Sequence, residues 1–456
     1  MSRGGSALPP SRRLAAPSQP NLLSPFPSSS FPRPQNPLAF KHYNAKEMVT
    51  FGKQTRSMED WCRFSVCYWH TFRGIGADPF GGQTLFRDWD DGSNSMENAL
   101  RRVDAAFEFH TKLGVPWYTF HDVDVSPQGA TLAESNKNLD KVADKLEAKQ
   151  KETGVKLLWG TANLFSHWRY AQGAATSPDA HVVAYAGAQV KKAMEVTHRL
   201  GGVNYVFWGG REGYQSILNT NVRRELDHLA QFLHMAVEHK KNIGATYQLL
   251  IEPKPREPTK HQYDYDAQTV IGFLKHYGLE NHFKVNIEPN HTTLAGHNYE
   301  HDIWVSSKYG MLGSIDSNTG DPLLGWDTDQ FPMNVKEALL TMWVVCEQGG
   351  LQPGGLNFDC KVRRESTDLA DMFIGHIGAM DTFAKGLKGA AALKKDAVWD
   401  KMLQKRYSSF DSGIGEKIEK RTTSFKELED YIHKNGEAKR FSGQQELYEV
   451  LLNKYA

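Results

Sequence analysis

Six carboxylates and one histidine are spaced between residues 252 and 359, and most of them follow a short apolar run. A carboxylate at the end of a buried strand is costly unless a cation compensates its charge, and several that converge would also repel one another. Oxygen-rich ligation is typical of magnesium or manganese rather than of thiolate-bound zinc. The pattern therefore predicts a centre for divalent cations, and its expected ligands are Glu252, Glu288, His291, Asp316, Asp327, Asp329 and Asp359.

Two pairs of charged residues, each two positions apart, refine this prediction. Glu252 and Lys254 would share one face of a strand end, where a lysine beside a metal ligand can hold a substrate oxygen. A surface Glu/Lys pair is the alternative, but the apolar run QLLI before Glu252 favours a buried site. Asp327 and Asp329 would look the same in a solvated acidic turn, and their position between two other ligand-bearing segments favours ligation.

Two histidines lie three residues from a carboxylate. Glu288 and His291 could reach one ion together, although a lone histidine is more often a core residue than a ligand. His121 and Asp124 are close enough for the carboxylate to hold the imidazole ring and fix its tautomer. Such a pair suits proton transfer to a sugar or alcohol oxygen, and a purely structural hydrogen bond is the alternative.

Aromatic residues are expected to form the walls of the site. Trp69 and Trp208 end strand-like runs, and Phe80 lies in the segment GADPFGG. Flat rings fit the apolar face of a sugar and keep water away from a reaction. Tryptophans at strand ends are also common packing residues, so these rings support the site only together with the charged groups.

Short β-branched and aromatic runs alternate with helical stretches from about residue 37 onward. Eight strands, each followed by a helix, predict a TIM (β/α)8 barrel, whose active site lies at the carboxyl ends of the strands. A doubly wound open sheet is the alternative, but it would need a glycine-rich phosphate loop after its first strand, and the sequence has none. The expected strands are residues 63–69, 116–121, 155–160, 204–209, 247–253, 283–288, 311–316 and 355–359.

Capping residues predict several helix ends. One helix is expected after Ser177-Pro178-Asp179, a second over about 132–153 before Gly154, and a third from Asp266 to near Gly278. These elements place the barrel within residues 38–392. Residues 393–456 lack a strand pattern and predict a C-terminal helical extension for subunit contacts.

Composition excludes several classes of function. The 456 residues are 40% hydrophobic and 23% charged with a net charge of +1, which predicts a globular protein without a nucleic-acid or membrane partner. No apolar stretch approaches the roughly 20 residues of a membrane span. The four cysteines form no CxxC pair, so buried reduced thiols and a cytoplasmic location are expected.

The first 37 residues differ from the rest of the chain. They are rich in Ser, Pro and Arg and contain no acidic residue, which predicts a disordered tail. The Arg/Ser bias resembles an organellar transit peptide, which would place the protein in an organelle instead. A solvated tail without an address is the alternative, because its prolines disfavour an amphipathic helix.

A set of motifs resembles the xylose isomerase family, in its longer class, from about residue 38 to the C-terminus. The motifs are WH, GADPFGG, FHDVD, LLWGTAN, VFWGGREG, IEPKPREPTKHQYD, NIEPNH, GSIDSNTG, GWDTDQFP and NFDCKVRR. The resemblance implies a TIM barrel with a C-terminal helical arm, a homotetramer and two divalent cations, with Mg²⁺ first and Mn²⁺ or Co²⁺ as alternatives. It implies a sugar substrate, with interconversion of D-xylose and D-xylulose and also of D-glucose and D-fructose.

The resemblance also implies a role for each matching residue. His121, oriented by Asp124, would assist opening of the cyclic sugar, and Lys254 would polarise the carbonyl oxygen with Glu257 nearby. Trp69, Thr161 and Trp208 would line the substrate pocket, and Phe80 would enter it from a neighbouring subunit. One ion would be held by Glu252, Glu288, Asp316 and Asp359. The second, catalytic ion would share Glu288 and take His291, Asp327 and Asp329.

The reaction implied by the resemblance is a hydride shift between C2 and C1 of the opened sugar. Proton abstraction through an enediol is the rival, and the residues alone do not separate the two. Barrels that isomerise other sugars such as rhamnose, a metal-dependent nuclease and a metal-stabilised structural protein are the alternative functions. The near-neutral charge speaks against the nuclease, and a structural protein would have no use for Lys254 or for the His121–Asp124 pair.

Overall fold

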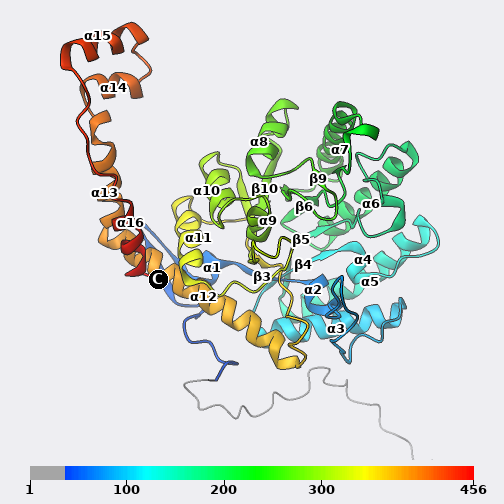
Figure 1. Cartoon of the computed structure of the whole chain (residues 1–456). Coiled ribbons are helices and arrows are strands. Elements are labelled where there is room, and N and C mark those ends of the chain that lie inside the picture. Colours follow the sequence, from blue (N-terminus) through cyan, green and yellow to red (C-terminus); the bar gives the residue numbers. More distant parts are fainter. Residues whose placement is uncertain (1–35) are drawn as a thin grey trace, which may run out of the picture.

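Eight parallel strands close into a barrel at the centre of the molecule (Figure 1). The computed structural model describes residues 36–456, and in it the strands follow the order β10-β11-β12-β3-β4-β5-β6-β8 around the barrel. Each of the eight expected strands is present, so the prediction of a TIM barrel is confirmed. The barrel strands are β3 Phe64–Cys67, β4 Trp117–His121, β5 Lys156–Thr161, β6 Asn204–Trp208, β8 Gln248–Glu252, β10 Phe283–Ile287, β11 Leu312–Asp316 and β12 Leu356–Phe358.

The strands are apolar because the barrel buries both of their faces. All four residues of β3 and all five of β11 are buried, as expected for parallel strands covered by helices. Helices lie around the outside of the barrel in Figure 1. The larger helices of the barrel are α3 Met96–Leu113, α5 Leu132–Thr153, α6 Ala180–Arg199, α7 Val222–Asn242, α8 Ala267–His276, α10 His301–Lys308, α11 Val335–Glu347 and α12 Leu369–Asp396.

The helix ends follow the chemistry of their capping residues. Helix α5 begins after Thr131, whose side chain accepts the Glu134 N–H, and ends at Gly154 with φ of 76°. Helix α8 begins after Asp266, whose side chain accepts the Thr269 N–H. Helix α6 begins one residue after Asp179, which is therefore the cap rather than the start of the helix.

One expected strand is shorter than predicted. The run 63–69 was expected to remain extended, but β3 ends at Cys67 and α2 (Tyr68–Arg73) follows at once. Trp69 and His70 therefore lie in a helical turn at the rim of the barrel rather than at a strand end. The remaining elements are β1 Met48–Phe51, β2 Gln54–Ser57, β7 Gly213–Tyr214, β9 His261–Gln262, α1 Met58–Cys62, α4 Asp122–Val125, α9 Pro289–Leu294, η2 Trp168–Tyr170 and η3 Ile217–Asn219.

A helical arm extends away from the barrel at the C-terminus (Figure 1). Helix α12 crosses the boundary expected at residue 393 and ends at Asp396, and the chain turns at Ala397 with φ of 51°. None of the residues of α13, α15 or α16 is buried. The elements of the arm are α13 Val398–Tyr407, η4 Ser408–Phe410, α14 Gly413–Glu419, α15 Phe425–Asn435 and α16 Gln445–Asn453.

Three expectations about the rest of the chain can be compared with the structure. All four cysteines are buried and free, as predicted. No helix within residues 36–456 combines the length and the apolar character that crossing a membrane requires. The tail expected over residues 1–37 lies almost wholly outside the described residues.

Candidate active site

The predicted site residues meet in a cavity at the carboxyl ends of the barrel strands. Its volume is about 180 Å³. Eleven of the residues singled out in the sequence line it: Trp69, His121, Thr161, Trp208, Glu252, Lys254, Glu288, His291, Asp327, Asp329 and Asp359. Asp124 and Asp316 are buried next to lining residues. Glu257 contacts Lys254 with a half-exposed side chain, and Phe80 lies elsewhere.

Glu288 is the centre of the acidic cluster. It follows β10 directly and precedes α9, whose first residue is Pro289, a position where a missing N–H costs nothing. Three groups of possible ligand atoms, each within 4.8 Å of one another, share this carboxylate. The other members of the groups are Asp316 with Asp359, Asp327 with Asp329, and Glu252 with His291.

Within residues 36–456, no lysine or arginine forms an ion pair with Glu252, Glu288 or Asp316, and His291, 3.1 Å from Oε2 of Glu288, is the nearby imidazole. Burial, followed by repulsion from neighbouring carboxylates, raises the pKa values of Glu252, Glu288 and Asp316 well above their usual range. Asp316 is fully buried, and its Oδ2 atom has no hydrogen-bond partner among the described residues. A buried carboxylate oxygen without a donor is a costly feature that a bound cation would relieve.

These observations fit divalent cations. The donor set consists of carboxylates and one imidazole, which suits magnesium and manganese. The imidazole of His291 is held at both nitrogens, with Nδ1 3.1 Å from the carbonyl oxygen of Pro253 and Nε2 3.0 Å from Oδ2 of Asp327. Because Glu288 belongs to all three groups of possible ligands, it could contribute to more than one ion.

Three buried asparagines donate hydrogen bonds to the carboxylates of the cluster, and the sequence prediction missed them. Asn286 donates to Oε2 of Glu252 at 2.8 Å, and Asn357 donates to Oδ1 of Asp316 at 3.0 Å. Asn318 donates to Oε1 of Glu288 at 2.6 Å. Asn286 and Asn357 each precede an expected ligand by two residues, so the alternation of side chains along a strand could have revealed them.

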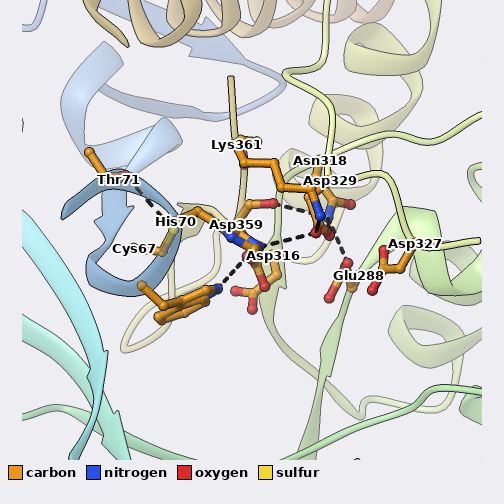
Figure 2. A network of polar contacts seen from close by, with 12 residues as sticks. Cys67, His70, Thr71, Glu288, Asp316, Asn318, Asp327, Asp329, Asp359 and Lys361 are labelled. Atoms are coloured by element: carbon orange, nitrogen blue, oxygen red, sulfur yellow. Dashed lines mark hydrogen bonds and ion pairs between the residues drawn. The ribbon is translucent and has the colours of Figure 1, made fainter. Parts of the chain in front are cut away.

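His70 is a second feature that the sequence prediction missed. Its Nε2 atom lies 3.1 Å from Oδ2 of Asp329 and 3.2 Å from Oδ1 of Asp359, so it connects two expected ligands (Figure 2). Burial alone would lower the pKa of His70, but the two carboxylates outweigh it and raise the pKa to about 9. Lys361 lies 2.8 Å from Oδ2 of Asp329, so this end of the cluster contains two cationic groups.

His121 and Asp124 form the expected pair. Nδ1 of His121 lies 2.8 Å from Oδ2 of Asp124, and the same oxygen accepts the backbone N–H of His121 at 2.8 Å. Asp124 therefore stabilises the neutral tautomer that carries its proton on Nδ1. In this tautomer Nε2 is unprotonated and can accept a proton. The ring of Trp69 packs edge-on against His121, with centroids 4.5 Å apart.

Lys254 is a buried ammonium group that lines the same cavity. Its Nζ atom lies 2.6 Å from Oδ2 of Asp327 and 3.3 Å from Oε2 of Glu257. Burial alone would lower its pKa, but the charges of these two carboxylates raise the pKa above its usual value. In return, Lys254 and then His291 hold the pKa of Asp327 well below its usual range against the effect of burial.

Two site residues have backbone angles that side chains rarely adopt. Glu257 has φ of 67° and Asp329 has φ of 45°, both in the left-handed region. Residues held in such conformations cost energy and are concentrated at functional sites. Oε2 of Glu257 also accepts the backbone N–H of Asp327 at 3.0 Å. This bond links the segment that follows Glu252 to the segment that contains Asp327 and Asp329.

Aromatic rings form the walls, and one expected ring is absent. Trp208 packs against Phe165 with centroids 4.3 Å apart, and Phe165, which the sequence prediction missed, lines the cavity. Trp69 also donates from Nε1 to Oδ1 of Asp359 at 2.8 Å. Phe80 is 80% exposed and lies outside the cavity of its own chain.

Comparisons with known proteins show the family of the chain. The family described as "Xylose isomerase-like TIM barrel" matches residues 120–322, and "XylA2 C-terminal domain" matches residues 403–456. The xylose isomerase of Rhodopirellula baltica is 57% identical over 93% of this chain and 96% of its own length. Those of Caldicellulosiruptor bescii and Arabidopsis thaliana are 55% and 54% identical over 93% and 92% of this chain, and 96% and 87% of their own lengths. With this identity along nearly its whole length, the chain belongs to the xylose isomerase family.

Proposed function

We propose that this protein is an aldose–ketose isomerase that interconverts D-xylose and D-xylulose. The observation that carries the proposal is the joint position of Lys254, the His121–Asp124 pair and the acidic cluster around one cavity. Each group alone has a structural explanation. Together they supply a proton-transfer group, a cationic donor and a site for divalent ions at the place where barrel enzymes bind substrates.

The two cation sites are those that the resemblance to xylose isomerases implies, and the shared position of Glu288 in the acidic cluster supports them. One ion would be held by Glu252, Glu288, Asp316 and Asp359, and a second by Glu288, His291, Asp327 and Asp329. Mg²⁺ is the first candidate, with Mn²⁺ or Co²⁺ as alternatives. Such ions, when bound, hold adjacent sugar oxygens and stabilise negative charge as it develops on them.

The side chains of the protein perform the remaining steps. His121 exchanges a proton at Nε2 with the ring oxygen or the C1 hydroxyl of the cyclic sugar, while Asp124 keeps the proton on Nδ1. Two of the three N–H groups of Lys254 can satisfy Asp327 and Glu257, which leaves one for the carbonyl oxygen of the opened sugar. Trp69 and Trp208 cover the apolar side of the opened sugar and exclude water. The hydrogen then moves between C2 and C1 of the sugar as a hydride.

Conversion of D-xylose by metal-stripped and metal-restored protein tests this function. Activity should vanish after chelation and return with Mg²⁺, Mn²⁺ or Co²⁺. A folded protein that binds two ions per chain without converting D-xylose under any of these conditions would contradict the proposed substrate, and other aldoses would then be screened.

Assembly and location complete the proposal. A homotetramer is supported by the arm, whose Phe425 and Phe441 are 93% and 76% exposed, and by the exposed ring of Phe80. Light scattering of the purified protein measures this state directly, and a monomer at all concentrations would contradict it. A cytoplasmic location is proposed, with import into an organelle through residues 1–37 as the alternative, and the mature N-terminus from fractionated cells separates the two.

A further inference from the structure

A second cluster of potential metal ligands lies outside the active site. His297, His301 and Asp302 each place a ligand atom within 4.8 Å of the other two. In the sequence they form the pattern H-x3-H-D, where α10 begins at His301. The spacing of three to five residues between two histidines is typical of zinc sites. None of the three lines the cavity around Glu288.

Unsatisfied polar atoms point to a ligand at this cluster. Asp302 is 3% exposed, and its Oδ1 atom is buried without a hydrogen-bond partner among the described residues. The same holds for Nε2 of His301. The other oxygen of Asp302 accepts the backbone N–H of Ala267 at 3.3 Å, so the side chain is fixed in place. A buried acceptor and a ring nitrogen that both lack partners are atoms that a cation would satisfy together.

A neighbouring carboxylate orients one of these two histidines, and the two imidazoles lie against each other. Their rings stack with centroids 4.1 Å apart and planes inclined by 19°. Nε2 of His297 lies 3.1 Å from Oδ2 of Asp266, and Oδ1 of Asp266 accepts the Thr269 N–H at the start of α8. A carboxylate that holds one nitrogen of a histidine, and so orients the ring, is the usual companion of a metal-binding imidazole.

We propose that His297, His301 and Asp302 form a third metal site, which binds a Zn²⁺-type transition-metal ion. Two imidazoles and one carboxylate suit Zn²⁺, Co²⁺ or Ni²⁺ better than Mg²⁺, which prefers oxygen ligands. The site therefore differs in its donor set from the oxygen-rich cluster around Glu288. His301 also lines a cavity of about 640 Å³ between the barrel and α16 of the arm. The ion joins the α9–α10 loop to α10 next to the arm.

Zinc content of the Mg²⁺-saturated full-length protein tests the proposal. Wild type, His301→Gln and Asp302→Asn are dialysed against limiting Zn²⁺ in excess Mg²⁺, and metal per chain is measured by mass spectrometry. Wild type should hold one more zinc per chain than either variant. Asp302→Asn keeps an oxygen that can accept the Ala267 N–H, so this variant should fold normally. It therefore tests the site independently if His301→Gln has a folding defect. His282→Gln, at an exposed histidine, is the matched control and should behave as wild type.

Two further readouts separate this site from the active site. Isomerase activity with Mg²⁺ should be unchanged in both variants, because neither residue touches the active-site cavity. Both wild type and His301→Gln are loaded with Co²⁺, and the visible spectrum of the variant is subtracted from that of wild type. The difference spectrum should show an absorption band of Co²⁺ bound by nitrogen ligands. Equal zinc content in wild type and both variants, or no difference spectrum, would overturn the proposal.

Discussion

Asp124 holds His121 twice, because one carboxylate oxygen accepts both the ring Nδ1–H and the backbone N–H of the same histidine, each at 2.8 Å. The two bonds fix the orientation of the ring and its tautomer together. The unprotonated nitrogen is then available without any rearrangement. This arrangement is suited to moving a proton at a sugar oxygen.

His121→Asn should therefore slow turnover of cyclic D-xylose by about 10²-fold or more, the usual contribution of a positioned acid–base group. Turnover of substrate supplied in the open-chain form should fall much less. Stopped-flow assays that start from freshly opened and equilibrated sugar measure the two rates. Equal losses for both forms would rule out a role in ring opening.

Asp327→Asn should weaken binding of one of two cations by about 100-fold and reduce activity in parallel. The substitution removes a charged oxygen that also pairs with Lys254 and His291. Calorimetric titration with Mn²⁺ measures both affinities, and circular dichroism checks the fold. Asp321→Asn, at an exposed position before the same segment, is the control. Wild-type affinity for both ions in Asp327→Asn would contradict the assignment.

His70→Asn should lower cation affinity by about 10- to 100-fold, the range for residues that orient metal ligands. The shorter side chain loses the contacts of Nε2 with both Asp329 and Asp359. His70→Gln keeps an N–H donor near the same place and should recover part of the affinity. If both variants bind Mn²⁺ as the wild type does, His70 has no positioning role.

The thermal stability of the metal-free protein should fall as pH rises. Raised pKa values mean that Glu252, Glu288 and Asp316 keep protons in the folded, metal-free protein that the unfolded chain loses above about pH 4.5. The folded state then binds more protons than the unfolded state, so the stability of the metal-free protein falls as pH rises. His70 acts in the same direction, because its contribution is lost as pH rises toward 9.

Bound cations neutralise these carboxylates, so the difference in Tm between metal-loaded and metal-free protein should grow from pH 5 to pH 8. His110 and His376, whose pKa values burial lowers to about 4, favour the folded state as pH rises. They contribute equally to both forms and cancel in the difference. Scanning calorimetry at several pH values measures it, and a constant difference would mean that the cluster does not bind the ions.

Much of the barrel could be predicted because its strands are buried on both faces and read as continuous apolar runs. The ligands were found because a charged residue at the end of such a run is conspicuous. His70 was missed because it follows the strand expected over 63–69, whereas β3 ends at Cys67 and His70 lies within α2 at the rim of the barrel. Asn286 and Asn357 were missed because a buried asparagine is informative only when its partner carboxylate is known.

The ligand-bearing strands β8, β10, β11 and β12 are neighbours in the barrel and also the last four barrel strands in the chain. A ribosome therefore releases Glu252 more than one hundred residues before Asp359. The half-barrel that carries His121 and Trp208 emerges first and can begin to collapse without any ion. The acidic half cannot have its full set of ligands until β12 has emerged, because Asp359 follows that strand.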